Sequence, residues 1–157
     1  MPSKSYILFL CLLAVFLSCN KTQDFHPEKK SFNDNWFFTM VEDHSADVDF
    51  LNNNDLSEWD SVRLPHTPRI EPLLVNDQWQ GISWYKKKFN LPENYKNKKL
   101  FIEFEAAMNI TEVWVNGKKL ITHQGGYLPF VIDISEVVHL EKTNTISVKI
   151  NNYDNTV

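Results

Sequence analysis

The chain has 157 residues, with 16 lysines and arginines against 20 aspartates and glutamates, and its formal net charge is −4. A chain without a basic surplus is not expected to bind nucleic acid, because that binding begins with the neutralisation of phosphates. The length suffices for one domain with its own hydrophobic core. We therefore expect a single folded domain with no nucleic-acid partner.

The first residues are typical of an export signal. Lys4 precedes an apolar run from Tyr6 to Leu17, which is shorter than the roughly 20 residues that span a bilayer but suits the core of a signal peptide. Cys19 follows the small residue Ser18, and this arrangement resembles a bacterial lipoprotein processing site. We predict a signal peptide over residues 1–18, lipidation at Cys19, and an exported protein anchored to the membrane by lipid alone, in the periplasm or at the cell surface. The alternative is ordinary cleavage nearby, with Cys19 an incidental thiol.

A polar stretch separates this signal from the folded part. Residues 19–31 favour a flexible tether, and the domain is expected to cover residues 32–157. Residues 36–40 predict the first strand. A long loop should follow it, with aromatic residues such as Trp59 folding back onto the core.

Strand signals then become regular. In residues 100–106, Leu100, Ile102, Phe104 and Ala106 share one face while Phe101, Glu103 and Glu105 share the other. This period of two marks a half-buried strand. Further strands are expected at residues 62–64, 82–90, 113–115 and 146–150, and a short helical turn is favoured only near 135–138. Several short strands spaced by about 8 to 15 residues favour an all-β sandwich.

The segment from Phe104 to Phe130 carries the strongest local signals. Asn116-Gly117 lies between apolar runs, and this pair predicts a tight hairpin because both central residues of a type I′ turn need positive φ. Trp114 faces opposite to its neighbouring valines, so either the sandwich covers both faces of that strand or Trp114 packs on another domain. Further on, Tyr127 and Phe130 are expected to close one end of the core.

Two lysine clusters stand out in this acidic chain. They are Lys86-Lys87-Lys88 and the group Lys96, Lys98 and Lys99. Lysines on strand edges discourage edge-to-edge pairing. We interpret both clusters as solvated strand edges rather than as a basic binding patch.

Catalytic and metal chemistry find little support in the sequence. Glu103 and Glu105 have Cα atoms about 6.6 Å apart on an extended strand, but every such pair shows this spacing, and we interpret them as the wet face of the strand. The five histidines are scattered without the spacing of a zinc site. His66, between Pro65 and Thr67, is interpreted as a hydrogen-bonded loop residue rather than a catalyst. We predict no catalytic residue, no metal site and no cofactor.

Sugar binding has better candidates, because it needs aromatic platforms beside planar polar groups. Asp77, Gln78 and Trp79 provide both in one loop, and Asn152 follows the last strand. These four residues are the predicted carbohydrate contacts. The structural alternative is that the polar residues cap turns and that Trp79 folds onto the core.

Seven stretches, in this order, resemble a known family. They are Val62-Arg63-Leu64-Pro65-His66-Thr67, Trp84-Tyr85-Lys86-Lys87-Lys88-Phe89, Phe104-Glu105-Ala106-Ala107, Val113-Trp114-Val115-Asn116-Gly117, His123-Gln124-Gly125-Gly126-Tyr127-Leu128-Pro129-Phe130, Asp133-Ile134 and Val148-Lys149-Ile150-Asn151-Asn152. Together they resemble the N-terminal sugar-binding domain of glycoside hydrolase family 2, the β-galactosidase, β-glucuronidase and β-mannosidase group. Lys87 stands where many members have arginine.

The resemblance implies a jelly-roll β-sandwich of the galactose-binding-like type and a β-linked sugar or oligosaccharide as ligand. It also implies immunoglobulin-like domains and a catalytic barrel as partners in a parent enzyme, with the two catalytic glutamates of a retaining mechanism in that barrel. We therefore expect a non-catalytic accessory domain of an exported β-glycosidase, of β-galactosidase type, present as an inactive fragment. A free-standing carbohydrate-binding module and a purely structural sandwich are the alternatives.

Overall fold

The computed structural model describes residues 27–41, 47–52, 55–69 and 79–153. Its contacts divide the chain into two units, Met1–Ser31 and Phe32–Val157. The second unit contains both sheets of the domain.

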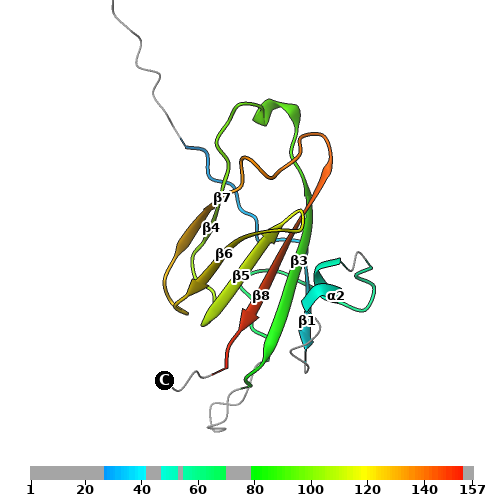
Figure 1. Cartoon of the computed structure of the whole chain (residues 1–157), viewed down its shortest axis with the longest axis vertical. Helices are drawn as coiled ribbons and strands as arrows, with labels where there is room; N and C mark the ends of the chain where they lie inside the picture. The colour runs from blue at the N-terminus through cyan, green and yellow to red at the C-terminus, as the bar shows by residue number, and fades with distance from the viewer. Residues whose placement is uncertain (1–26, 42–46, 53–54, 70–78, 154–157) are drawn as a thin grey trace, which may run out of the picture. The chain divides into compact units, whose positions relative to one another are not determined.

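Two antiparallel sheets form the domain (Figure 1). The larger has six strands in the order β2-β1-β3-β8-β5-β6, and the smaller pairs β4 with β7. The strands are β1 (Trp36–Val41), β2 (Asp60–Val62), β3 (Ile82–Asn90), β4 (Phe101–Phe104), β5 (Ile110–Val115), β6 (Lys118–Gln124), β7 (Phe130–Asp133) and β8 (Thr143–Asn151). The two short helices of the described residues are α2 (Asp47–Asn52) and the 3₁₀ turn η1 (Glu93–Tyr95).

The main core lies between the two sheets. Its buried members are Trp36, Phe38, Tyr85, Ala107, Val113, Val115, Phe130, Ile132, Ile134, Ile146 and Val148. The alternation predicted for residues 100–106 is confirmed in part: Ile102 and Phe104 face this core and Phe101 is exposed, but the strand ends at Phe104. The all-β sandwich is confirmed.

The six-stranded sheet has two different ends. One end, which we call the loop end, is formed by residues 79–81, 105–109, 125–129 and 151–153. The other, which we call the turn end, is formed by the Asn116-Gly117 turn with residues 90–93 and 137–144. The register places Ile82 opposite Asn151 at the loop end and Asn90 opposite Thr143 at the turn end. In Figure 1 the loop end is the lower end of β3, β5 and β8.

The predicted hairpin is confirmed at the turn end. Asn116 and Gly117 have φ of 50° and 79°, as a type I′ turn requires. The Asn116 side chain accepts a hydrogen bond from Thr145 N at 2.9 Å and donates to Val137 O at 2.7 Å and to Asn144 Oδ1 at 2.8 Å. The turn is thus bonded to the start of β8 as well as closing its own hairpin.

The outer face of the six-stranded sheet carries a second core, which we call the tryptophan cluster. It buries Leu56, Trp59, Ile82, Trp84 and Trp114. The Trp84 and Trp114 rings lie 5.3 Å apart, and Phe50 of α2 stacks on Trp84 with centroids 6.0 Å apart. Of the two options for Trp114, cover on both faces of its strand is therefore the one observed.

The prediction that lysines 86–88 form a solvated edge is wrong for Lys86 and Lys87. Strand β3 is central in its sheet, and both side chains are buried while Lys88 is exposed. On the outer face, the Lys86 ammonium donates to Phe50 O at 2.7 Å and Leu51 O at 3.3 Å. These carbonyls belong to the last turn of α2, where the helix dipole attracts a cation.

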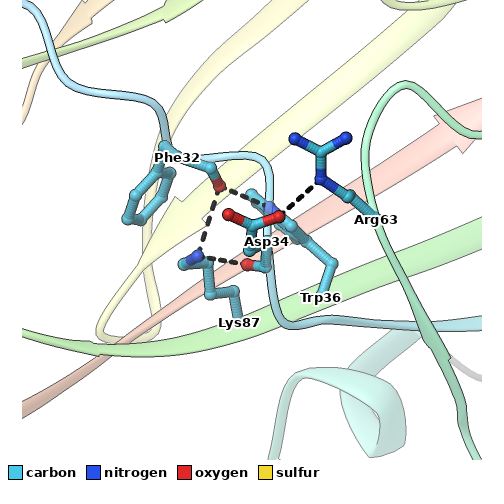
Figure 2. A network of polar contacts seen from close by, with 5 residues as sticks. All are labelled: Phe32, Asp34, Trp36, Arg63 and Lys87. Atoms are coloured by element: carbon cyan, nitrogen blue, oxygen red, sulfur yellow. Dashed lines mark hydrogen bonds and ion pairs between the residues drawn. The ribbon is translucent and has the colours of Figure 1, made fainter.

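Lys87 performs the corresponding task on the other face of β3 (Figure 2). Its ammonium donates to Phe32 O at 3.2 Å and to Asp34 O, and lies 4.3 Å from the centre of the Phe32 ring. Arg63 Nε donates to Asp34 Oδ1 at 2.6 Å, and Trp36 Nε1 donates to Phe32 O at 2.8 Å. These contacts bind the segment leading into β1 to the sheet. Burial lowers the pKa of both Lys86 and Lys87.

One end of the core is closed differently from the prediction. Phe130 is buried, stacked between Phe104 at 4.6 Å and His123 at 4.1 Å. Tyr127, which was expected to join it, is instead 84% exposed. The turn near residue 135 is confirmed, with Val137 N donating to Ile134 O at 3.1 Å.

Candidate functional site

The structure brings together two of the four predicted carbohydrate contacts. Trp79 and Asn152 both lie at the loop end, Trp79 just before β3 and Asn152 just after β8. Asp77 and Gln78 lie outside the described residues. The candidate site is therefore built from Trp79, Asn152 and their described neighbours.

The Asn152 side chain binds backbone rather than standing free. Its Nδ2 donates to Trp79 O at 2.9 Å, and its Oδ1 accepts from Gly81 N at 2.6 Å. The Asn152 amide N donates to Gly81 O at 3.1 Å. These three bonds fix residues 79–81 beside the end of β8, so Asn152 positions the Trp79 segment.

The Trp79 ring lies directly over Gly81. A Cβ added to Gly81 would come within 2.4 Å of Trp79 Cζ2 and 2.9 Å of Cη2, so only glycine leaves room for the ring in this place. Trp79 is half-buried. A half-buried tryptophan next to a fixed backbone is a candidate platform on which the apolar face of a sugar can stack.

Further hydrogen bonds join the neighbouring loops to this segment. Asn109 Nδ2 donates to Tyr153 O at 2.6 Å, and Asn109 O accepts from Gly125 N at 2.9 Å. Asn109 itself has a φ of 55°, a conformation that asparagine tolerates better than most residues. Asn109 was not among the predicted contacts; its place directly before the first apolar residue of β5 was the available signal.

His66 takes the structural role that was expected. Its Nδ1 shares a hydrogen bond with the Tyr85 hydroxyl at 3.0 Å, and its ring lies 4.6 Å from that of Phe38. Burial lowers the pKa of His66, although Asp60 opposes this shift, and burial raises the pKa of Tyr85. The pair is thus held neutral against the main core.

The acidic residues considered for catalysis lie elsewhere. Glu103 lies on the exposed face of β4, and Glu105 is exposed just beyond its end. Within residues 27–41, 47–52, 55–69 and 79–153, no three histidines, cysteines or acidic residues are grouped so as to hold a metal ion. Over the same ranges, no helix is long and apolar enough to cross a membrane.

Fold and loop end together define a class: a β-sandwich domain that holds a tryptophan and planar amides at one end of its strands. The profile of the family described as "Glycosyl hydrolases family 2, sugar binding domain" matches residues 29–157. The chain belongs to this family.

Related proteins agree with that assignment. A β-glucuronidase from Formosa agariphila is 33% identical over 135 residues, which cover 80% of this chain and 14% of the relative. A β-galactosidase from Thermoanaerobacter pseudethanolicus is 35% identical over 111 residues, which cover 69% of this chain and 14% of the relative. The structure of a Bacteroides uniformis β-glucuronidase superposes with a TM-score of 0.71 at 28% identity, covering 80% of this chain and 15% of that one. The chain thus spans about one seventh of the length of these relatives.

Proposed function

We propose that this chain is the carbohydrate-binding accessory domain of an exported retaining β-glycosidase, with the catalytic residues elsewhere in a longer protein. The observation that carries the proposal is the Trp79 ring held over Gly81 by Asn152. Family membership supports it from a separate direction, since the family is described as a sugar-binding domain. The immunoglobulin-like domains and catalytic barrel expected from the resemblance remain proposed partners.

In this proposal Trp79 contacts the sugar, and Asn152 holds Trp79 in position. All of the hydrogen bonds of the Asn152 side chain described above go to backbone atoms of residues 79 and 81. Asp77 and Gln78 precede Trp79 in the sequence and are proposed to supply polar contacts. Such a site binds weakly, because one stacked ring contributes only about 1 kcal/mol beyond the area it buries.

A titration of the 157-residue chain tests the proposal. Methyl β-galactoside, β-glucuronide and β-mannoside are added up to millimolar concentrations while tryptophan fluorescence or calorimetric heat is recorded. We expect saturable binding, with the galactoside preferred, and its loss in Trp79→Ala. Phe101→Ala is the matched control, because Phe101 is an exposed aromatic on the other sheet.

Two results would change the interpretation. Saturable binding that persists in Trp79→Ala would move the site away from the loop end. If no sugar binds at millimolar concentration, the domain has a structural task, and the two bonds from the Asn152 side chain to backbone atoms favour that second function.

The export part of the proposal rests on Lys4, the apolar run after it and Cys19. A diacyl chain attached to Cys19 would hold the protein on the membrane, since each buried CH₂ contributes about 0.8 kcal/mol. Replacing Cys19 by serine should move the protein from the membrane fraction to the soluble fraction. An unchanged distribution would exclude lipidation at this residue.

A further inference from the structure

The loop end also exposes a group of large apolar side chains that sugar binding does not use. Tyr127 is 84% exposed, Leu128 60% and Met108 43%. We call these three residues the apolar patch. They come from two loops, residues 105–109 and 125–129, which follow β4 and β6.

The two loops touch each other, so the patch is continuous. A Cβ added to Gly126 would lie 3.4 Å from Met108 Sδ and 3.1 Å from Asn109 N, and one added to Gly125 would lie 3.1 Å from Leu128 Cδ1. Gly125 has a φ of 126°, which other residues rarely adopt. The small residues thus bring the Met108 loop against the Tyr127 loop.

Hydrogen bonds hold these loops in place. Gly125 N donates to Asn109 O at 2.9 Å, and the ring of His123 donates from Nε2 to Gly125 O at 3.2 Å while stacking on Phe130. A surface that is already ordered loses little conformational entropy when it is covered. Exposed tyrosine, leucine and methionine on a fixed frame are therefore suited to a docking surface, in which tyrosine and methionine are enriched.

The same frame fixes the place where the chain leaves the domain. After β8 ends at Asn151, Tyr153 O accepts a hydrogen bond from Asn109 Nδ2 at 2.6 Å. Asn109 therefore links the outgoing chain to the loop that carries Tyr127. The last described residue, Tyr153, is thus bonded to the loop that carries Met108 of the apolar patch.

The other exposed apolar residues differ in their surroundings. Phe101 and Val131 lie on the exposed face of the two-stranded sheet, where the register pairs Phe101 with Asp133 and Val131 with Glu103. Charged side chains directly opposite keep that face hydrated. Phe101 and Val131 therefore provide a matched control within the same domain.

We propose that the apolar patch is the docking surface for the polypeptide that follows this domain in the longer protein, with Tyr127 as its anchor. The chain covers about one seventh of the length of its relatives, so most of such a protein lies outside this domain. This remaining polypeptide is the proposed occupant of the patch. The inference rests on the part of the proposed function that places the domain in a longer enzyme, and it is independent of sugar binding.

Hydroxyl-radical footprinting compares the 157-residue chain with the full-length product of the gene. We expect the oxidation rates of Met108, Tyr127 and Leu128 to fall several-fold in the longer product, while those of Phe101 and Val131 stay the same. In the longer product, Tyr127→Asp should restore the oxidation of Met108 and Leu128, and Val131→Asp should not.

Three outcomes would overturn the proposal. Equal oxidation of the patch in both proteins would show that nothing covers it, and if Trp79-dependent sugar binding persists, only the docking inference fails. Protection in the short chain that increases with its concentration would assign the surface to a second copy. A reading frame that stops after Val157 would remove the occupant and, with it, the proposed parent enzyme.

Discussion

At both ends of the sandwich an asparagine side chain is hydrogen-bonded to other segments of the chain. The two asparagines differ in burial and in the number of their hydrogen bonds. At the turn end Asn144 is fully buried and makes four hydrogen bonds: Oδ1 accepts from Asn116 Nδ2 and His139 N, and Nδ2 donates to His139 O and Lys142 O. At the loop end Asn152 makes two side-chain bonds and remains half-buried.

This difference suggests that one end stabilises the fold while the other is accessible to a ligand or another domain. An amide in the interior that satisfies its full hydrogen-bonding capacity locks the backbone around it, because any movement would leave a polar group unpaired. At the loop end the Asn152 side chain holds the backbone with two bonds, Trp79 is half-buried and Tyr127 is exposed. The turn end is thus suited to hold the fold, and the loop end to meet a ligand or another domain.

Removing the turn-end amide should have the largest effect. Asn144→Ala removes all four hydrogen bonds of a fully buried amide, so we expect the free energy of unfolding to fall by about 3 kcal/mol. Urea unfolding followed by fluorescence measures this value. Asn94→Ala, on the exposed η1 turn, is the control; a loss below that of the control would contradict the role of Asn144.

The corresponding change at the loop end should cost less and act on binding. Asn152→Ala removes two half-buried bonds, for which we expect a loss of about 1 kcal/mol in unfolding free energy. Sugar affinity should nevertheless fall, because residues 79–81 lose their support. Calorimetric titration of the folded variant checks this expectation. Wild-type affinity in a variant of lower stability would reduce Asn152 to a purely structural residue.

Changing the most exposed residue should have the smallest effect on stability. Tyr127→Ser is expected to alter the unfolding free energy of the 157-residue chain by no more than about 0.5 kcal/mol. Thermal and urea unfolding should both show this. A marked loss would mean that the Tyr127 ring supports its own loop, and the contrast between the two ends would then be weaker than the exposures indicate.

Local signals in the sequence predicted the parts of this fold that depend on neighbours in the chain. The Asn116-Gly117 hairpin and the faces of Ile102 and Phe104 follow from turn chemistry and alternation, and both are confirmed. The burial of Lys86 could not be read in this way, because it depends on α2, whose carbonyls come from a segment about 36 residues earlier.

The candidate site shows the same division. Trp79 and Asn152 were found by residue type, and their proximity follows from the antiparallel pairing of β3 with β8. That Asn152 binds backbone atoms, and that Tyr127 turns outward while Phe130 turns inward, depends on contacts between loops. Residue composition alone carries no information about such contacts.

The adjacent residues Lys86 and Lys87 have a consequence for the order in which the domain folds. Their ammonium groups reach α2 on one face of β3 and the segment before β1 on the other. Both contacts are long-range, since they join β3 to residues 36 and 55 positions earlier in the chain. We therefore expect amide hydrogens near Phe32 and Phe50 to exchange earlier than those of β3 and β8, with these two segments the last to fold and the first to open.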